Sequence, residues 1–307
     1  MTKIVVVGSL NMDLVVRVPK IPEPGETILG NGFATFPGGK GANQAVAAAR
    51  LGADVTMIGQ VGSDSFGEAL IENLNNEGVQ TEFVAVDRTE ATGVALITVD
   101  ADGQNSIAVA SGANYTFTSK QVNQAWNKLN DVDILVMPLE TPPDTIIAAT
   151  KLARESHAKV ILNPAPARPL TKELLSMIDV IVPNELEVIQ IVNFLGSPVN
   201  EIQDAVNILL DYGVGAVVTT LGSDGAEIFE KDKKSLHLTQ YDVDIVDTTA
   251  AGDAFIGAFA VGLGEGKSLY DACCFANAAG ALTVTKAGAQ PSLPKRIEVD
   301  KLLGNCK

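Results

Sequence analysis

The sequence predicts an α/β fold with three layers, in which helices cover both faces of a mainly parallel central sheet, plus a small β-sheet lid. Short β-branched runs alternate with longer helical patterns through most of the chain, which is typical of βαβ units. Two stretches, 14–34 and 92–111, break this alternation with strand-like patterns and turns but no helix. We therefore expect residues 1–307 to form one main domain to which these stretches contribute the lid.

The expected strands of the central sheet are short, and several are apolar on both faces, as buried parallel strands are. They span residues 3–7, 55–59, 133–137, 159–162, 180–182 and 216–220. Two helix starts have the pattern of a capping box, Ser65-Phe66-Gly67-Glu68 and Thr118-Ser119-Lys120-Gln121. Trp126 should pack in the core behind the second. From residue 243 onward we expect one strand and then helices rich in Ala and Gly.

The composition excludes several classes of partner. Acidic residues outnumber basic residues, 37 to 22, and the net charge of -15 repels nucleic-acid phosphates and anionic lipids. The three cysteines, Cys273, Cys274 and Cys306, do not predict a disulfide framework, and the two histidines lack partners at zinc-ligand spacing. The first apolar run is too short for a signal peptide, and no stretch approaches the ~20 apolar residues of a membrane span. We expect a cytoplasmic protein that binds neither nucleic acid nor membrane.

Polar or glycine-rich segments follow five of the expected strands. In open α/β sheets, ligands bind beyond the carboxyl ends of the strands, so these segments together should line a cleft. The segments are Gly8 to Asp13, Glu140, Asn163, Asn184 to Glu187, and Leu221 to Gly225.

Two familiar phosphate-binding motifs do not fit. The segment Gly38-Gly39-Lys40-Gly41 has Ala34 where a P-loop needs its first Gly and Gly41 where it needs Ser or Thr. The segment that follows the first strand lacks the second Gly of a dinucleotide fingerprint. These departures disfavour a P-loop enzyme and a nicotinamide dehydrogenase.

The segment 247–255 remains as a phosphate-site candidate, because it forms a turn that opens a long apolar helix. Ala251 and Gly252 carry no bulky side chains, so phosphate oxygens can approach their N–H groups at the helix N-terminus. Asp253 follows in the first helical turn. An isolated acid there could simply complement the helix dipole, but its neighbours favour a functional role.

These residues carry a family resemblance. Segment 247–255 resembles the C-terminal signature of the ribokinase family of carbohydrate kinases, and segment 38–45 resembles its N-terminal signature. Segments 8–13 and 288–292, and Asn184 with Glu187, also match in order and spacing, so the resemblance spans essentially the whole chain. The chain departs from the broad family at Ala250, where Gly is usual.

The resemblance implies an ATP-dependent kinase acting on the primary (5-) hydroxyl of a small sugar, with D-ribose favoured. Asp253 would accept the hydroxyl proton, and the N–H groups of Ala250, Ala251 and Gly252 would form an anion hole. The implied sugar-binding residues are Asn11, Met12, Asp13, Gly39, Lys40, Gly41, Ala42, Asn43, Glu140 and Asp253.

The resemblance also implies sites for nucleotide and cations. Asn184 and Glu187 would organise Mg²⁺ and its waters as outer-shell ligands, because Mg²⁺ dehydrates reluctantly. The nucleotide would be lined by Thr220, Leu221, Gly222, Ser223, Asp224, Gly225, Gly252 and Asn277. A K⁺ site would comprise Asp247, Thr249, Thr283, Lys286, Gly288 and Ser292.

Alternative functions stay open at this point. The substrate could be deoxyribose, fructose or a nucleoside such as adenosine, for which Met12 and Ile107 are candidate apolar contacts. A non-catalytic sugar sensor is disfavoured, because a pure binder does not need Asp253 beside an anion hole. The lid stretches should expose strand edges, which proteins tend to cover, so we expect a homodimer joined through the lids.

Overall fold

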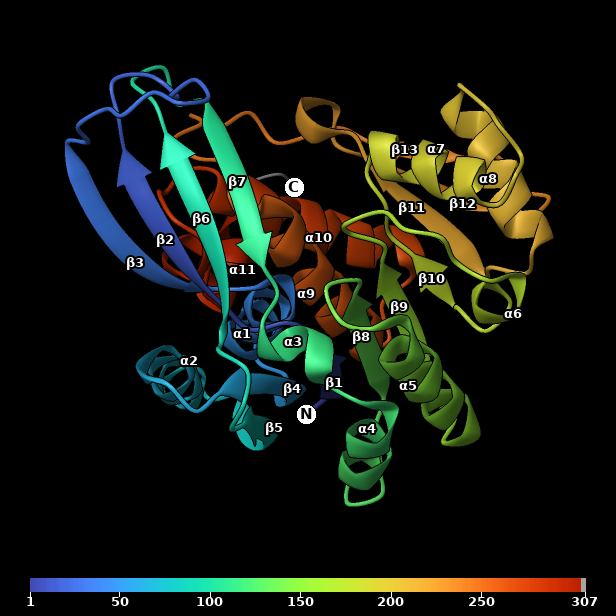
Figure 1. Cartoon of the computed structure of the whole chain (residues 1–307). Coiled ribbons are helices and arrows are strands. Elements are labelled where there is room, and N and C mark those ends of the chain that lie inside the picture. Colours follow the sequence, from blue (N-terminus) through green and yellow to red (C-terminus); the bar gives the residue numbers. More distant parts are fainter. Residues whose placement is uncertain (305–307) are drawn as a thin grey trace.

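The computed structural model describes residues 1–304, which contain a nine-stranded sheet, helices on both its faces and a separate four-stranded sheet (Figure 1). The main sheet has the order β13-β12-β11-β10-β9-β8-β1-β4-β5. All pairs from β5 to β11 are parallel, whereas β12 and β13 pair antiparallel at one edge. The predicted three-layer α/β fold is confirmed. Its strands are β1 (Lys3–Val7), β4 (Asp54–Gly62), β5 (Gln80–Asp87), β8 (Ile134–Pro138), β9 (Lys159–Asn163), β10 (Val180–Ile181), β11 (Ala216–Thr220), β12 (Ala226–Glu230) and β13 (Leu236–Leu238).

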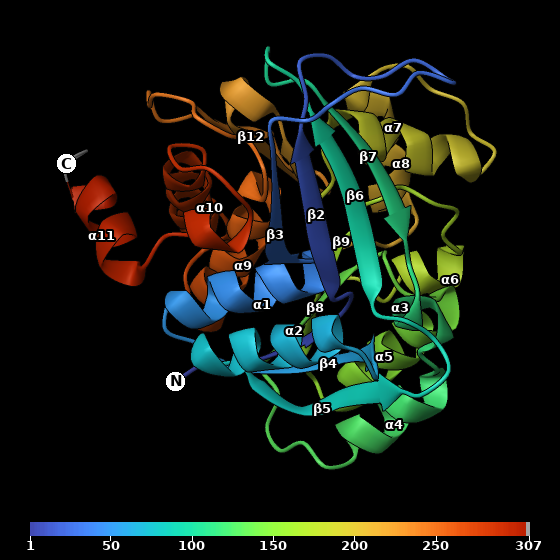
Figure 2. The same ribbon diagram turned by 60° about the vertical axis from the view of Figure 1, so that its left-hand side comes forward.

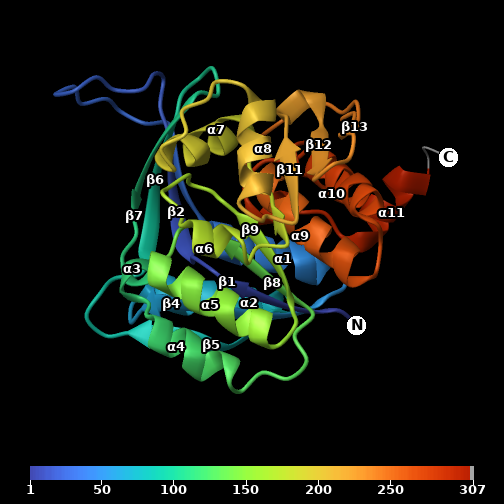
Figure 3. The same cartoon turned by 90° about the vertical axis from the view of Figure 1, so that its right-hand side faces the viewer.

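Helices cover both faces of this sheet (Figure 3), and a hydrophobic core lies on each face. The period-two alternation of β1 divides its side chains between them, with Ile4 and Val6 in one core and Val5 and Val7 in the other. The first core contains side chains of α1 (Lys40–Arg50), α2 (Ser65–Asn76), α9 (Ala251–Gly264), α10 (Leu269–Thr283) and α11 (Arg296–Gly304). The second contains side chains of α4 (Ser119–Trp126), α5 (Pro143–Glu155), α6 (Lys172–Leu175), α7 (Glu185–Phe194) and α8 (Ile202–Asp211).

The order of strands reverses at β1. The chain first builds outward from β1 through β4 to β5, and then resumes on the other side of β1 with β8, β9, β10 and β11. Ligands of open α/β sheets bind in the crevice outside the carboxyl ends of the strands at such a switch point. The topology therefore predicts a ligand site at the segments that follow β1 and β8.

The second sheet forms the predicted lid. It consists of β2 (Asn11–Arg17), β3 (Gly32–Gly38), β6 (Gly93–Val99) and β7 (Asn105–Ala110), with the order β3-β2-β6-β7. Two antiparallel hairpins join through the parallel pair β2 and β6, and the sheet stands above β4 and β5 in Figure 2. Strands β2 and β3 extend past the predicted stretch 14–34 to Asn11 and Gly38, so this hairpin begins at the predicted site residue Asn11 and ends directly before the predicted site residue Gly39.

One helix start differs from its prediction. The N-cap of α2 is Asp64 rather than Ser65, and its carboxylate accepts the N–H of Gly67 over 2.9 Å. Asp64 also accepts the N–H of Thr92 over 2.8 Å, which ties the start of α2 to the segment before β6. The capping box of Thr118 and Gln121 is confirmed.

The prediction of a strand after residue 243 is wrong. Residues 243–246 are irregular, because the N–H groups of Val246 and Asp247 donate to the carbonyl of Val284 after α10 instead of pairing with a strand. Trp126 packs in the second core, as predicted. Strands β5, β12 and β13 were not predicted.

The cysteines within residues 1–304 are free thiols, Cys273 being buried and Cys274 partly buried. Cys306 lies outside the described residues. Across the part of the chain that the structure describes, no helix has the length and hydrophobicity to span a bilayer.

Candidate active site

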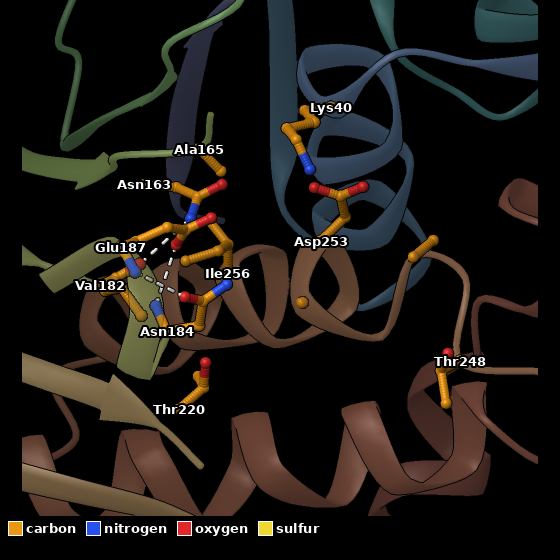
Figure 4. A pocket seen from close by; sticks show the side chains of 12 residues that line it. Lys40, Asn163, Ala165, Val182, Asn184, Glu187, Thr220, Thr248, Asp253 and Ile256 are labelled. Carbon is orange, nitrogen blue, oxygen red and sulfur yellow. Dashed lines mark hydrogen bonds between the residues drawn. The ribbon is translucent and has the colours of Figure 1, made fainter. Parts of the chain in front are cut away.

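A cavity of about 210 Å³ lies beyond the carboxyl ends of β9, β10 and β11, where α1, α7 and α9 begin (Figure 4). Its lining includes Lys40, Asn163, Asn184, Glu187, Thr220 and Asp253. Residues predicted from motifs far apart in the chain therefore meet around one hollow.

Asp253 occupies the first turn of α9 and is only 7% exposed. Both of its carboxylate oxygens accept hydrogen bonds from side-chain amides of α1. Asn43 Nδ2 donates to Oδ2 over 2.9 Å, and Gln44 Nε2 donates to Oδ1 over 3.0 Å. The structure thus joins Asp253 and Asn43, which were both predicted site residues, and adds Gln44, which was not.

Lys40 is the first residue of α1, and its ammonium group faces the Asp253 carboxylate in Figure 4. The negative charge of Asp253 raises the pKa of Lys40 despite its burial, and Glu140, Glu187 and Asp13 add to this effect. Lys40 therefore remains a cation inside an acidic cluster. It is partly buried rather than a solvated surface lysine.

Asp13 and Glu140 are further carboxylates whose charges act on Lys40. Burial, followed by the charges of Glu140 and Asp253, raises the pKa of Asp13 to about 7, while Lys40 opposes the shift. Glu140 accepts hydrogen bonds from the Ser9 hydroxyl and from the Lys40 N–H, the latter over 3.2 Å. Ser9, which was not among the predicted site residues, thus fixes Glu140 between β1 and α1.

Glycines let α1 begin directly against the end of β1. Gly39 has a φ of 89°, and a Cβ there would lie 2.6 Å from the Asn11 nitrogen. A Cβ on Gly41 would lie 2.6 Å from the Ser9 nitrogen. Side chains at these two positions would push the helix away from the strand, so both glycines have a packing reason.

Three further predicted sugar-binding residues lie in different environments: Asn11, Met12 and Ala42. The Asn11 side chain accepts a hydrogen bond from Asn114 Nδ2 over 2.8 Å, which holds the start of β2. Met12 and Ala42 are buried in the first core. The predicted apolar candidate Ile107 is 55% exposed on β7.

The turn before α9 has unusual backbone geometry. Ala250 is the N-cap of α9 and has a φ of 60°, in the left-handed region that non-glycine residues seldom adopt. The first N–H groups of a helix lack intrahelical partners, and in this turn the Ala251 N–H donates to the Thr248 carbonyl over 3.3 Å. A Cβ on Gly252 would meet nothing within 4 Å, so packing within the protein does not explain that glycine.

Asn184 and Glu187 form the capping box of α7. Asn184 Oδ1 accepts the Glu187 N–H over 2.8 Å, and Glu187 Oε2 accepts the Asn184 N–H over 2.9 Å. Burial raises the pKa of Glu187, against the hydrogen bond from Asn184 and the charge of Lys40. The Glu187 carboxylate keeps a second oxygen for other ligands.

The predicted nucleotide residues divide into two groups. Thr220 and Gly252 line the cavity, whereas residues 221–225 form the tight connection between β11 and β12 and are not part of its lining. Asn277, on α10, donates to the Thr239 carbonyl over 2.9 Å and so fixes the segment that follows β13.

The predicted K⁺ residues centre on Asp247. Its carboxylate accepts the N–H of Thr249 over 2.9 Å and the N–H of Gly288 over 2.8 Å, joining the loops before α9 and after α10. Although burial opposes the shift, these hydrogen bonds lower the pKa of Asp247. The hydroxyls of Thr283 and Ser292 donate to the carbonyls of Ala279 and Ala289, and Lys286 pairs with Glu298.

Comparison with known proteins decides the family. The model of the pfkB family of carbohydrate kinases matches residues 1–296. The chain belongs to this family. The resemblance inferred from the motifs is thereby confirmed.

Relatives within the pfkB family cover nearly all of the chain. It is 42% identical over 298 residues to a ribokinase of Haemophilus influenzae, covering 97% of each chain. The solved structure of a Thermotoga maritima ribokinase aligns with a TM-score of 0.91 and 37% identity, covering 99% of this chain and 100% of that one. An Arabidopsis thaliana ribokinase complexed with ribose and ATP aligns with a TM-score of 0.89 and 35% identity, covering 99% of both.

Proposed function

We propose that this pfkB-family chain is an ATP-dependent kinase that transfers the γ-phosphate of ATP to the primary (5-) hydroxyl of D-ribose. The observation that carries the proposal is the buried Asp253 carboxylate, oriented by two amides, in the first turn of α9. The ribokinases that resemble the whole chain support ribose as the sugar.

Asp253 acts as the base in this proposal. It takes the proton of the sugar hydroxyl as that oxygen bonds to the γ-phosphorus, while the bond from the γ-phosphorus to the leaving oxygen of ADP breaks. The N–H groups of Ala250, Ala251 and Gly252 stabilise the charge that develops on the transferring group. The open space beside Gly252 supports this role, because it leaves room for phosphate oxygens.

The sugar lies between the lid and α1. Asp13 and Glu140 accept from its hydroxyls, and Lys40 and Asn43 donate to them. The backbone of the adjoining segments completes the site. These further residues are Asn11, Met12, Gly39, Gly41 and Ala42.

Nucleotide and Mg²⁺ lie beside α7. Asn184 and Glu187 fit water-mediated Mg²⁺ binding, since one Glu187 oxygen remains available and Mg²⁺ usually keeps several waters. Residues 1–304 contain no group of three or more His, Cys, Asp or Glu side chains placed to enclose a metal ion. When bound, Mg²⁺ supplies charge neutralisation for the phosphates. The nucleotide contacts Thr220 to Gly225, Gly252 and Asn277.

A K⁺ ion lies next to the Asp247 turn in this proposal. The donor set consists of oxygens, which suits a hard cation: the Asp247 carboxylate, the hydroxyls of Thr249 and Ser292, and carbonyls near Thr283, Lys286 and Gly288. The hydrogen bonds that Asp247 accepts from Thr249 and Gly288 support this placement, because they join the two loops at that carboxylate.

The lid supports a homodimer. Every residue of the edge strand β7 is exposed, and Phe33, Leu96, Ile107 and Val109 each expose more than half of their surface, at 68%, 53%, 55% and 51%. An exposed strand edge with apolar side chains is a surface that proteins tend to cover. In this proposal, a second copy of the lid covers this surface.

The direct test is product analysis after incubation with ATP, Mg²⁺, K⁺ and D-ribose. The proposal predicts a ³¹P NMR signal of a phosphomonoester on the primary carbon, with one ADP formed per ester. A non-catalytic sensor would bind ribose without releasing ADP. That result would contradict the proposed function.

A further inference from the structure

A chain of side-chain amides connects the candidate base to the central sheet. Gln44 Nε2 donates to Asp253 Oδ1 over 3.0 Å and to Asn163 Oδ1 over 3.1 Å. Asn163, at the end of β9, in turn donates from Nδ2 to the Val182 carbonyl over 3.1 Å. This series of hydrogen-bonded amides therefore connects α9 through α1 to β9 and the segment after β10.

The donor and acceptor directions in this series of amides are fixed at both of its ends. A backbone carbonyl only accepts, so Asn163 must direct its NH₂ group to Val182 and its oxygen to Gln44. An ionised carboxylate also only accepts, so Gln44 must direct its NH₂ group to Asp253. The two hydrogens of the Gln44 amide are thereby matched to two acceptors, and a flipped amide would face both of them with oxygen.

The burial of Gln44 makes this arrangement hard to replace. Gln44 is 0% exposed, and within the described residues its Oε1 finds no hydrogen-bond partner. Solvent therefore cannot substitute for its amide as a donor to Asp253. Asn43 binds only the other carboxylate oxygen, so each oxygen of Asp253 has one amide donor.

We propose that Gln44 is a positioning residue for phosphoryl transfer, holding the Asp253 carboxylate in one orientation through its hydrogen bonds to Asp253 and Asn163. The inference rests on the proposed role of Asp253 as the base. An ionised carboxylate oxygen accepts about two hydrogen bonds. With one lone pair of each oxygen bound to an amide, the other remains for the sugar hydroxyl.

The charged groups around Asp253 do not supply this constraint. Lys40 from α1, Asp13 from β2 and Glu187 from α7 interact with Asp253 through their charges. Glu140 interacts with Asp13 and Lys40. Such charges act over distance and do not select one rotation of the carboxylate, whereas hydrogen bonds to its two oxygens do.

The test uses two substitutions of Gln44. Gln44→Met keeps the length and apolar volume but removes both donors, so the Asp253 carboxylate can rotate. We expect kcat to fall roughly 10- to 100-fold, the scale of a small misplacement of a reacting group, with little change in KM for sugar or ATP. Gln44→Glu puts a third acceptor beside those of Asp253 and Asn163, so a proton must be retained there. We expect its kcat to fall at neutral pH and the acidic limb of its kcat profile to move to higher pH.

Gln60→Met is the matched control. Gln60 is also a buried glutamine, 3% exposed, and its Nε2 donates to the Asp87 carboxylate over 3.1 Å, away from the cavity. It should lose thermal stability as Gln44→Met does, but keep its kcat and its pH profile. If Gln44→Met does not fold, Gln44→Glu, which keeps the shape of the side chain, carries the test.

Crystal structures of wild type and Gln44→Met provide a readout that does not depend on activity. We expect the Asp253 carboxylate to bind Asn43 and Gln44 in wild type and to adopt another rotamer in the variant. An active wild type with unchanged kcat and pH profile in both Gln44 variants would overturn the inference. A wild type without any sugar kinase activity would refute the proposed function instead, and an unchanged Asp253 rotamer in Gln44→Met would then overturn the inference as well.

Discussion

The side-chain amide of Asn43 donates to the carboxylate of Asp253 over 2.9 Å, although the two residues are 210 positions apart in the chain. The contact joins the first turns of α1 and α9, which pack on the same face of the sheet. Both helices therefore direct their N-terminal, positive ends to the same carboxylate. The proposed base lies where two signature segments of a pfkB kinase meet.

Asp253→Asn tests the base. The substitution keeps the size of the side chain but removes the proton acceptor, so kcat should fall at least ~10²-fold, the lower end for a lost general base. Sugar affinity, measured by calorimetry, and the circular dichroism spectrum should stay nearly unchanged. Retention of more than half of the wild-type kcat would show that another group accepts the proton.

The pKa of Asp13 predicts a pH dependence of stability. Burial and neighbouring carboxylates raise this pKa from 3.8 to about 7, so between these values the folded protein holds a proton that the unfolded chain has lost. The contribution of Asp13 to the free energy of unfolding therefore falls as pH rises through this window. Asp13→Asn should remove that term.

Urea unfolding of the ligand-free proteins measures this effect. The stability of Asp13→Asn relative to wild type should increase from pH 5 to pH 8. The difference between the two proteins isolates Asp13 from other titrating groups. A difference that is the same at both pH values would contradict the raised pKa.

Asp247→Ala tests the cation site. If a K⁺ ion orders the turn before α9, initial rates at saturating ATP and Mg²⁺ should rise with K⁺ in wild type and lose most of that response in the variant. Mg²⁺ dependence should survive, because Asn184 and Glu187 form a separate site. The hydrogen bonds from Thr249 and Gly288 offer an alternative, in which Asp247 only caps the loops. Equal activation by K⁺ in both proteins, with lower stability in the variant, would favour capping alone.

Leu96→Glu tests the lid dimer. Leu96 is 53% exposed on β6, and a charge at this position should separate lids that pack against one another. Analytical ultracentrifugation at micromolar concentration should give a dimer for wild type and a monomer for the variant. Ile297→Glu, at a 76% exposed position on α11, is the matched control and should remain dimeric. A monomeric wild type would contradict the proposed assembly.

Much of the fold follows from local patterns. The predicted runs 3–7 and 216–220 coincide with β1 and β11, and the Thr118 capping box starts α4 as expected. These features depend on neighbouring residues, which a sequence displays directly. The strand expected after residue 243 does not form, because the N–H groups of Val246 and Asp247 donate to the Val284 carbonyl. No local sequence pattern reveals this contact.

The candidate site residues that lie in a sequence motif could be predicted from the sequence. Asp253 and Asn43 stand in recognisable segments, and their meeting follows from the shared sheet edge. Gln44 was not predicted as a site residue, because a glutamine in a helix is an ordinary helix former. Its role depends on the register of α1 against α9 and β9. The only sequence signal for that role is its position directly after Asn43. Ser9 was missed for a similar reason, since its partner Glu140 comes from the segment that follows β8.

ADP release across a panel of pentoses, hexoses and nucleosides, with K⁺ present and absent, tests the central claim most directly. We predict that D-ribose gives the highest kcat/KM, that K⁺ increases the rate, and that deoxyribose, fructose and adenosine are poorer substrates. ADP release that is the same with and without any sugar, or that is fastest with a nucleoside, would contradict the assignment of this chain as a ribose kinase.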